Sequence, residues 1–238
     1  MTKKLLTFAL AVLPLTIMTL TVAPALAQQS PQYKYPFQNP DLPAAQRIAN
    51  ILSLMTTEEK IDFLSTDTSV KRLGIPSFGG SEGIHGVVQR AKSQGGYRPD
   101  AIPTTQFPQP PGMGETWDPS IVRAAAGVEG HEARFISQTA KYGDRPILML
   151  WGPQSDLARD PRWGRSEEVY GEDPFFNGTM VTAFVHGLQG DNPRYWQAAS
   201  LLKHFLANSN EKDRTKTSSN FDDRLCWEYY SVPFRMGF

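Results

Sequence analysis

The alternation of apolar and polar residues along this chain predicts short strands separated by helices. Apolar residues at helical spacing predict helices over residues 42–54, 57–64, 119–138, 175–188 and 222–233. Short apolar runs predict strands over residues 75–78, 146–151 and 198–205. A capping box, Thr56-Thr-Glu-Glu59, marks the start of the second helix. Strands that alternate with helices are typical of a parallel sheet covered by helices, so the pattern predicts an α/β fold.

The alternation alone does not separate a (β/α) barrel from an open, doubly wound sheet. Polar residues with functional character follow the predicted strands, at residues 79–87, 152–173 and 203–214. Barrels carry their sites at the C-terminal ends of their strands, and open α/β sheets do the same at a switch point. The position of these residues therefore predicts a site at the strand ends in either architecture.

The first residues have the composition of a targeting signal. Lys3 and Lys4 precede an apolar run over residues 5–22, and Ala25-Leu-Ala27 offers a cleavage site. We expect a signal peptide over residues 1–27 that is cut after Ala27, with export to the periplasm or out of the cell. The length of the apolar run leaves an uncleaved anchor as the alternative. Residues 28–41 are then an extended leader, and residues 42–238 form one domain.

Composition excludes several classes of partner. The chain has 24 basic and 24 acidic residues, and without Lys3 and Lys4 the balance is 22 against 24, a net charge of −2. Because no basic run of five or more occurs, nucleic acid and anionic membranes are not expected as partners. The single Cys226 rules out an intrachain disulfide framework and a multi-cysteine zinc site. No motif indicates a metal or a cofactor, and nothing indicates an oligomeric state.

A long polar loop follows the predicted strand at residues 146–151. Between Trp151 and Pro174 it holds three arginines, six acidic residues and Trp163. Loops of this length without secondary structure are usually functional. Reciprocal charges can form bidentate pairs that hold such a loop rigid, which suits the binding of a hydroxyl-rich ligand. The simpler interpretation is a salt-bridged surface loop.

Two shorter patterns carry competing interpretations. Gly79-Gly-Ser81-Glu-Gly83 fits the nucleophile elbow of an α/β-hydrolase, with Ser81 as the nucleophile of an esterase. Lys203 and His204 end an apolar strand, where they are either a rim lysine beside a core histidine or hydrogen-bond donors to a polyol. Because adjacent strand residues point to opposite faces, both reach one ligand only if the backbone is irregular at residues 203–205.

Four motifs occur in chain order: SEGIHGV at residues 81–87, DPRWGR at 160–165, YGEDP at 170–174 and KHFLAN at 203–208. Together they resemble the N-terminal barrel domain of glycoside hydrolase family 3, the β-glucosidases and β-xylosidases. The resemblance extends from about residue 37 to the end of the chain. It implies a (β/α)8 TIM-barrel-like domain, incomplete in this chain.

The resemblance also implies an activity and a binding site. Members of this family remove β-linked glucose or xylose from the non-reducing end of oligosaccharides, with retention of configuration. Carried over by motif, Glu82, Arg165, Lys203 and His204 bind the substrate sugar. No residue here occupies the nucleophile motif, so we expect the nucleophile and the acid/base beyond this chain. The fragment is then inactive alone, and a non-catalytic carbohydrate-binding fragment is the alternative to a glycosidase. Most members carry Asp where Glu82 stands, which leaves glucosides, xylosides and arabinosides open as substrates.

Overall fold

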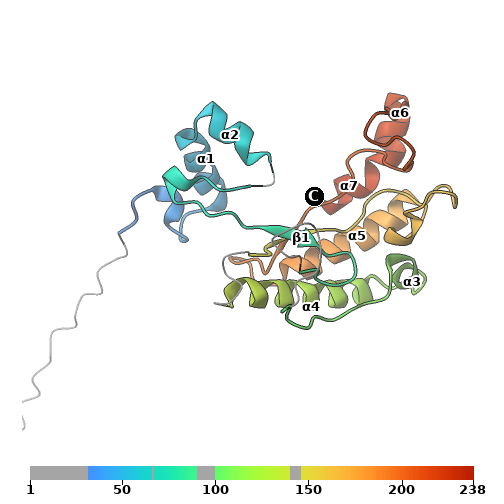
Figure 1. Cartoon of the computed structure of the whole chain (residues 1–238), viewed down its shortest axis with the longest axis horizontal. Helices are drawn as coiled ribbons and strands as arrows, with labels where there is room; N and C mark the ends of the chain where they lie inside the picture. The colour runs from blue at the N-terminus through green and yellow to red at the C-terminus, as the bar shows by residue number, and fades with distance from the viewer. Residues whose placement is uncertain (1–31, 66, 90–99, 140–145) are drawn as a thin grey trace, which may run out of the picture. The chain divides into compact units, whose positions relative to one another are not determined.

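The computed structural model describes residues 32–65, 67–89, 100–139 and 146–238, which form two compact units divided between Ser53 and Leu54. The expected signal peptide lies outside the described residues. Figure 1 shows the elements in chain order, coloured from blue to red.

The first unit contains a short turn packed against one amphipathic helix. A short 3-10 turn, η1 (Pro36–Gln38), precedes helix α1 (Ala44–Leu54), which continues to the boundary between the units. The Phe37 amide donates to Asn50 Oδ1 at 3.1 Å, and Arg47 Nε donates to the Phe37 carbonyl at 2.7 Å. Phe37 is buried. The expectation of a fully extended leader over residues 28–41 is therefore wrong in the described part, because these contacts fold residues 36–38 against the helix.

Helix ends in the second unit are fixed by side-chain caps and prolines. Thr56 and Glu59 form the expected capping box at the start of α2 (Thr57–Phe63). Asp118 caps α4 (Pro119–Gln138), and Asp173 caps α5 (Pro174–Gln189), each with proline in the first turn. These helices confirm the predicted ones within two residues. The remaining helical segments are η2 (Lys71–Leu73), α3 (Pro110–Gly114), η3 (Ser166–Glu168), α6 (Asp223–Leu225), the π-helical η4 (Cys226–Tyr230) and α7 (Val232–Gly237).

Three parallel strands carry the α/β architecture. In the described residues the sheet has the order β1 (Gly80–Glu82), β2 (Met149–Trp151) and β3 (Ala199–Ser200). Glu82 is in register with Trp151, and Leu150 with Ser200. The α/β prediction is confirmed. Three short strands do not by themselves form a barrel.

All three predicted strands differ from the observed ones, and the one expected over residues 146–151 is a strand only at Met149–Trp151. The run at 75–78 is not a strand: Ile75 forms only an antiparallel bridge with Val70, and the strand begins at Gly80. Pro76 explains this, because it has no amide to donate to a ladder. The run at 198–205 forms a strand only at Ala199–Ser200, with an isolated bridge further on at Lys203, and cis peptide bonds lie at Lys203–His204 and Phe205–Leu206. The expected irregularity at residues 203–205 is thus present.

The final helix is longer and less regular than predicted. Helicity was expected over residues 222–233, whereas the structure has α6, a π-helical turn and α7 in succession up to Gly237. Pro233 does not end the helix, because it lies in the first turn of α7, where amides need no intrahelical acceptor.

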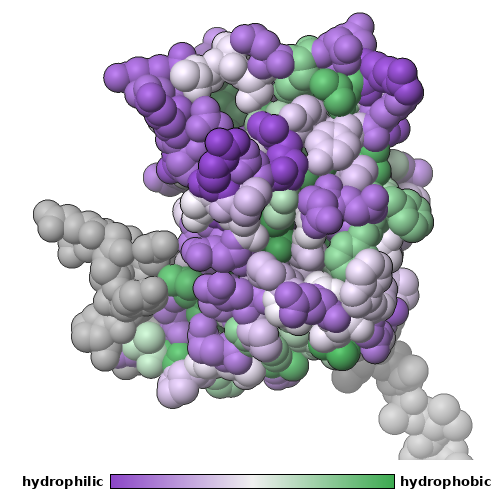
Figure 2. Space-filling view, turned by 90° about the vertical axis from the view of Figure 1, so that its right-hand side faces the viewer, coloured by the Kyte–Doolittle hydropathy of each residue, from purple (hydrophilic) through white to green (hydrophobic). Residues whose placement is uncertain are grey.

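The core lies between the sheet and the helix pair α4 and α5, which lie side by side in Figure 1. Its fully buried members include Val122, Ala126, Leu150, Val181, Phe184 and Leu188. Figure 2 shows a face where hydrophilic residues surround separate hydrophobic patches. No helix among the described residues is long and apolar enough to cross a membrane.

Close approach of α4 and α5 depends on Gly187, which gives the first prediction. A Cβ at Gly187 would lie 2.2 Å from the Arg123 carbonyl oxygen and 2.9 Å from Ala126 Cβ. Because backbone must move, we expect Gly187→Ala to lower the free energy of unfolding by about 1–3 kcal/mol in urea denaturation.

Gly127→Ala is the matched control, since its Cβ would find the nearest atom only at 3.8 Å. That change is expected to be neutral or to stabilise by up to about 1 kcal/mol, as alanine is the better helix former. Equal destabilisation by both variants would show that contact between α4 and α5 is not limited by Gly187.

Candidate functional site

The C-terminal edge of the sheet gathers the polar residues of the site. Glu82 is the last residue of β1, Gln154 and Asp156 follow β2, and Lys203 follows β3. Because the strands are parallel, their C-terminal ends meet at one edge. Residues far apart in the sequence therefore lie close together in the second unit.

The first pair at this edge is an ion pair between Lys203 and Glu82. Lys203 Nζ lies 2.6 Å from Glu82 Oε2, and the side chains are 11% and 30% exposed. An isolated parallel bridge joins Lys203 to Gln154, and the Ser155 amide donates to the Lys203 carbonyl at 2.7 Å. A buried ammonium is thus compensated by a carboxylate from the opposite edge strand.

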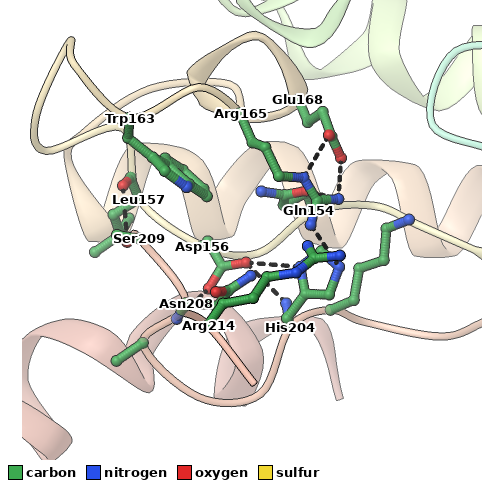
Figure 3. Close-up of polar contacts among 12 residues, drawn as sticks. Gln154, Asp156, Leu157, Trp163, Arg165, Glu168, His204, Asn208, Ser209 and Arg214 are labelled. Atoms are coloured by element: carbon green, nitrogen blue, oxygen red, sulfur yellow. Dashed lines mark hydrogen bonds and ion pairs between the residues drawn. The ribbon is translucent and has the colours of Figure 1, made fainter. Parts of the chain in front are cut away.

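Arg165 is held by contacts on three sides, as Figure 3 shows. Its Nε and Nη2 donate to the two carboxylate oxygens of Glu168, each at 2.6 Å. Nη2 also lies 3.2 Å from Gln154 Oε1, and Nη1 lies 3.1 Å from His204 Nε2. The hydrogen bonds to Glu168, above all, raise the pKa of the Arg165 guanidinium. The fork is therefore charged and fixed in its plane.

The partners of His204 fix its hydrogen-bonding role. An arginine nitrogen can only donate, so His204 Nε2 accepts from Arg165 Nη1. The other ring nitrogen, Nδ1, lies 3.2 Å from Asp156 Oδ2 and donates to it. A neutral ring with its proton on Nδ1 satisfies both contacts. The expectation that His204 donates to a ligand stays a prediction.

All four residues expected at the site are brought together. Glu82 contacts Lys203, His204 follows Lys203 in the chain, and His204 contacts Arg165. Glu82, Arg165 and Lys203 line a cavity of about 660 Å³, a size typical of small-molecule sites. In the part of the chain that the structure describes, no group of three or more His, Cys, Asp or Glu residues is arranged to hold a metal ion.

The polar loop after β2 is rigid in the expected way. Arg162 forms a bidentate pair with Asp160, at 3.0 and 2.6 Å, and this pair lowers the pKa of the Asp160 carboxyl. Trp163 is buried, and its Nε1 donates to Glu211 Oε1 at 3.2 Å. Trp163 thus attaches the loop, two residues before Arg165, to the segment that carries Glu211, whereas the Arg162 side chain of the other pair is 88% exposed.

Three residues of the site were missed by reasoning from the sequence alone. Gln154 is fully buried and accepts a hydrogen bond from Arg165, and Glu168 accepts hydrogen bonds from the same guanidinium. Asp156 accepts hydrogen bonds from the segment after β3. Only their position in the sequence could have indicated them. Gln154 and Asp156 follow a predicted strand within five residues, and Glu168 stands three residues after Arg165. The partners of Asp156 are 48 and 52 residues away. Gln154 and Glu168 meet Arg165, which is 11 and 3 residues away, only after the loop has folded, and the sequence pattern does not show this.

The esterase interpretation of Ser81 fails on geometry. Ser81 lies in the middle of β1, is buried and donates its hydroxyl to the Val88 carbonyl at 2.5 Å. A nucleophile elbow needs a sharp turn between a strand and a helix, with the hydroxyl exposed beside a histidine. Here no helix follows within the described residues up to 89, and no His hydrogen bond to Ser81 is found there.

Comparison with known proteins identifies the family. The sequence model of the glycosyl hydrolase family 3 N-terminal domain matches residues 42–235. The chain belongs to glycoside hydrolase family 3. The expectation based on the four motifs is thereby confirmed.

Relatives within family 3 carry two kinds of name. A xylan 1,4-beta-xylosidase of Xylanibacter ruminicola is 33% identical over 217 residues, which are 84% of this chain and 23% of that protein. A thermostable beta-glucosidase B of Acetivibrio thermocellus is 30% identical over 194 residues, which are 79% of this chain and 24% of that protein. The chain thus spans about a quarter of the length of these relatives.

Solved structures of family 3 proteins have the same fold. A beta-glucosidase from Kluyveromyces marxianus in complex with glucose aligns with a TM-score of 0.63 at 27% identity, covering 80% of this chain and 21% of that one. An exo-beta-xylosidase in complex with a xylobiose aziridine probe aligns with a TM-score of 0.65 at 23% identity, covering 85% and 26%.

Beneath the cavity wall lies a buried acid, Glu129 of α4. It is fully buried, and neither carboxyl oxygen has a well-formed hydrogen bond within the described residues. Burial raises its pKa to about 8, and the backbone of Gly86, a cavity-lining residue, opposes this in part. Burial also raises the pKa of the nearby Tyr170 hydroxyl. Glu129 is therefore protonated at neutral pH, a feature that periodicity alone does not reveal.

The pH dependence of stability tests this state of Glu129. Between the ordinary pKa of 4.5 and about 8, the folded protein keeps a proton that the unfolded chain loses. The free energy of unfolding should therefore fall as pH rises through this window, by a few kcal/mol at most. Glu129→Gln removes the titrating group and should flatten the decline, as measured by urea denaturation from pH 5 to pH 8.

The exposed Glu172→Gln is the control, and it should leave the slope as in the wild type. An unchanged slope in Glu129→Gln would show that Glu129 is ionised in the folded protein across the whole range.

Proposed function

We propose that this domain binds the non-reducing-end sugar of β-xylosides or β-glucosides, in a protein that hydrolyses their O-glycosyl bond with retention. The observation that carries the proposal is the convergence of Glu82, Arg165 and Lys203 on one cavity at the strand ends of a family 3 domain. A carboxylate accepts hydrogen bonds from two vicinal hydroxyls, while a guanidinium and an ammonium donate to hydroxyl oxygens. Such contacts accelerate hydrolysis when they strengthen in the oxocarbenium-like transition state.

The proposal extends to architecture and location. The three parallel strands belong, in this proposal, to a (β/α)8 barrel, and residues 42–238 to one domain. The likeness to family 3 structures supports the barrel. The nucleophile and the acid/base come from segments other than residues 1–238. Residues 1–27 act as a signal peptide for export to the periplasm or out of the cell. An N-terminus at Gln28 in the mature protein, read by mass spectrometry, tests that step.

Two sugars, xylose and glucose, are candidates for the sugar that is released. The relative that is 33% identical is named a xylan 1,4-beta-xylosidase, and the one that is 30% identical is named a beta-glucosidase. Comparing aryl β-xyloside with aryl β-glucoside in the full-length protein decides between them. The ratio of the two kcat/KM values is the measure of preference.

Substitutions at the two cations test the binding role. Arg165→Lys keeps the charge but loses the bidentate fork, and Lys203→Met removes the ammonium while keeping most of the volume. In the full-length protein, each should lower kcat/KM by about ten- to a thousandfold, as one or two charge-assisted hydrogen bonds are lost.

The matched control is Arg162→Lys, which breaks an equivalent bidentate pair on the same loop at a side chain that is 88% exposed. Its kcat/KM should stay within about twofold of the wild type. Wild-type kcat/KM in both Arg165→Lys and Lys203→Met would refute the binding role. Absence of glycosidase turnover in the full-length wild type, with sugar still bound, would favour a non-catalytic carbohydrate-binding protein.

A further inference from the structure

Asp156 is a buried carboxylate that the proposed sugar contacts do not use. Its side chain is 0% exposed and follows β2 by five residues. Oδ2 accepts from the His204 amide at 2.8 Å and from His204 Nδ1 at 3.2 Å. Oδ1 accepts from the Asn208 amide at 3.1 Å. Figure 3 shows Asp156 directed toward His204 and Asn208, which come from the segment after β3.

The contacts of Asp156 join two segments whose mutual position defines the site. An ionised carboxylate only accepts hydrogen bonds, and here three donors satisfy it. Two of these donors are backbone amides, so Asp156 holds the main chain on both sides of the cis bond at Phe205–Leu206. The third donor is the imidazole ring, so Asp156 also determines how that ring is turned.

A chain of hydrogen bonds leads from Asp156 to the guanidinium of Arg165. Asp156 Oδ2 accepts a hydrogen bond from His204 Nδ1, so the ring proton is on Nδ1 and Nε2 keeps its lone pair. That lone pair meets Arg165 Nη1 at 3.1 Å. With the opposite tautomer, an N–H of the ring would face an N–H of arginine, and the contact would be lost. The plane of Arg165 thus depends on the tautomer of His204 as well as on Glu168.

We propose that Asp156 is a positioning residue, which locks His204 as the neutral Nδ1–H tautomer and thereby holds Arg165 in its orientation toward the sugar. Its consequence for catalysis rests on the proposed function. The tautomer does not rest on it, because it follows from the contacts alone. Asp156 has no contact with the sugar in this account and acts only through His204 and the backbone.

The state of the His204 ring is directly measurable. In protein labelled with 15N-histidine, His204 should show a protonated Nδ1 and an unprotonated Nε2 at neutral pH. Its signals are identified by their loss in His204→Gln. A neutral His204 with the proton on Nε2, or a doubly protonated ring, would overturn the proposal before any variant of Asp156 is made.

Two variants separate positioning from general packing. Asp156→Ala removes both acceptors, so His204 should show a mixture of tautomers and kcat/KM should fall at least about tenfold. Asp156→Asn keeps one acceptor oxygen. That oxygen should face the two donors of His204, since the opposite orientation satisfies only the single Asn208 amide. This variant should therefore retain the Nδ1–H tautomer and recover most of the activity that Asp156→Ala loses.

The control is Asp160→Ala, which removes a partly exposed carboxylate from the same loop and should leave the ring signals of His204 unchanged. A wild-type tautomer in folded Asp156→Ala would overturn the proposal. If Asp156→Ala does not fold, Asp156→Asn decides, because the tautomer and kcat/KM should change together or stay together. A retained Nδ1–H tautomer with nearly full activity supports control by Asp156, and so does a shifted tautomer with lowered kcat/KM. A retained tautomer with a tenfold loss refutes it. If the full-length protein has no glycosidase activity, the proposed function fails while the tautomer measurement still decides the role of Asp156.

Discussion

The Lys203–Glu82 ion pair is the contact on which the site depends. β1 and β3 are the outer strands of the described sheet, with β2 between them, so this pair joins the two outer strands across the end of the central one. An ammonium with only 11% of its side chain exposed requires a nearby carboxylate. Removing either partner leaves the other as an unpaired, poorly solvated charge. The position of the two outer strands at this edge therefore depends on both charges being present.

The rest of the site repeats this matching of charges. Arg165 is paired with Glu168, and the neutral ring of His204 lies between Arg165 and Asp156. Each cation has a protein acceptor before a ligand arrives, and the ring and the guanidinium are fixed by contacts on two sides. Preorganised donors cost little reorganisation when charge develops in a transition state. A neutral sugar meets directed hydrogen bonds here without a large net charge.

Much of the fold could be predicted from the sequence, and the failures have physical causes. The bounds of α4 and α5 were predictable because an aspartate cap and a following proline are local signals. The strands were predicted too long, because hydrophobicity marks burial and not ladder pairing, and pairing depends on distant neighbours. The motifs predicted which of the four site residues converge, but not that His204 accepts, since its role is set by Arg165 and Asp156. Glu129 went unnoticed because helical periodicity does not show which acidic residue faces the core.

A structure of the full-length protein with bound xylose or glucose tests the central claim most directly. The account predicts that sugar hydroxyls lie within hydrogen-bond distance, about 2.6–3.2 Å, of Glu82, Arg165 and Lys203, in the cavity at the strand ends. It also predicts that Arg165 keeps its bidentate pair with Glu168 while the sugar is bound. A sugar bound elsewhere, with these three side chains keeping only their present protein partners, would contradict it.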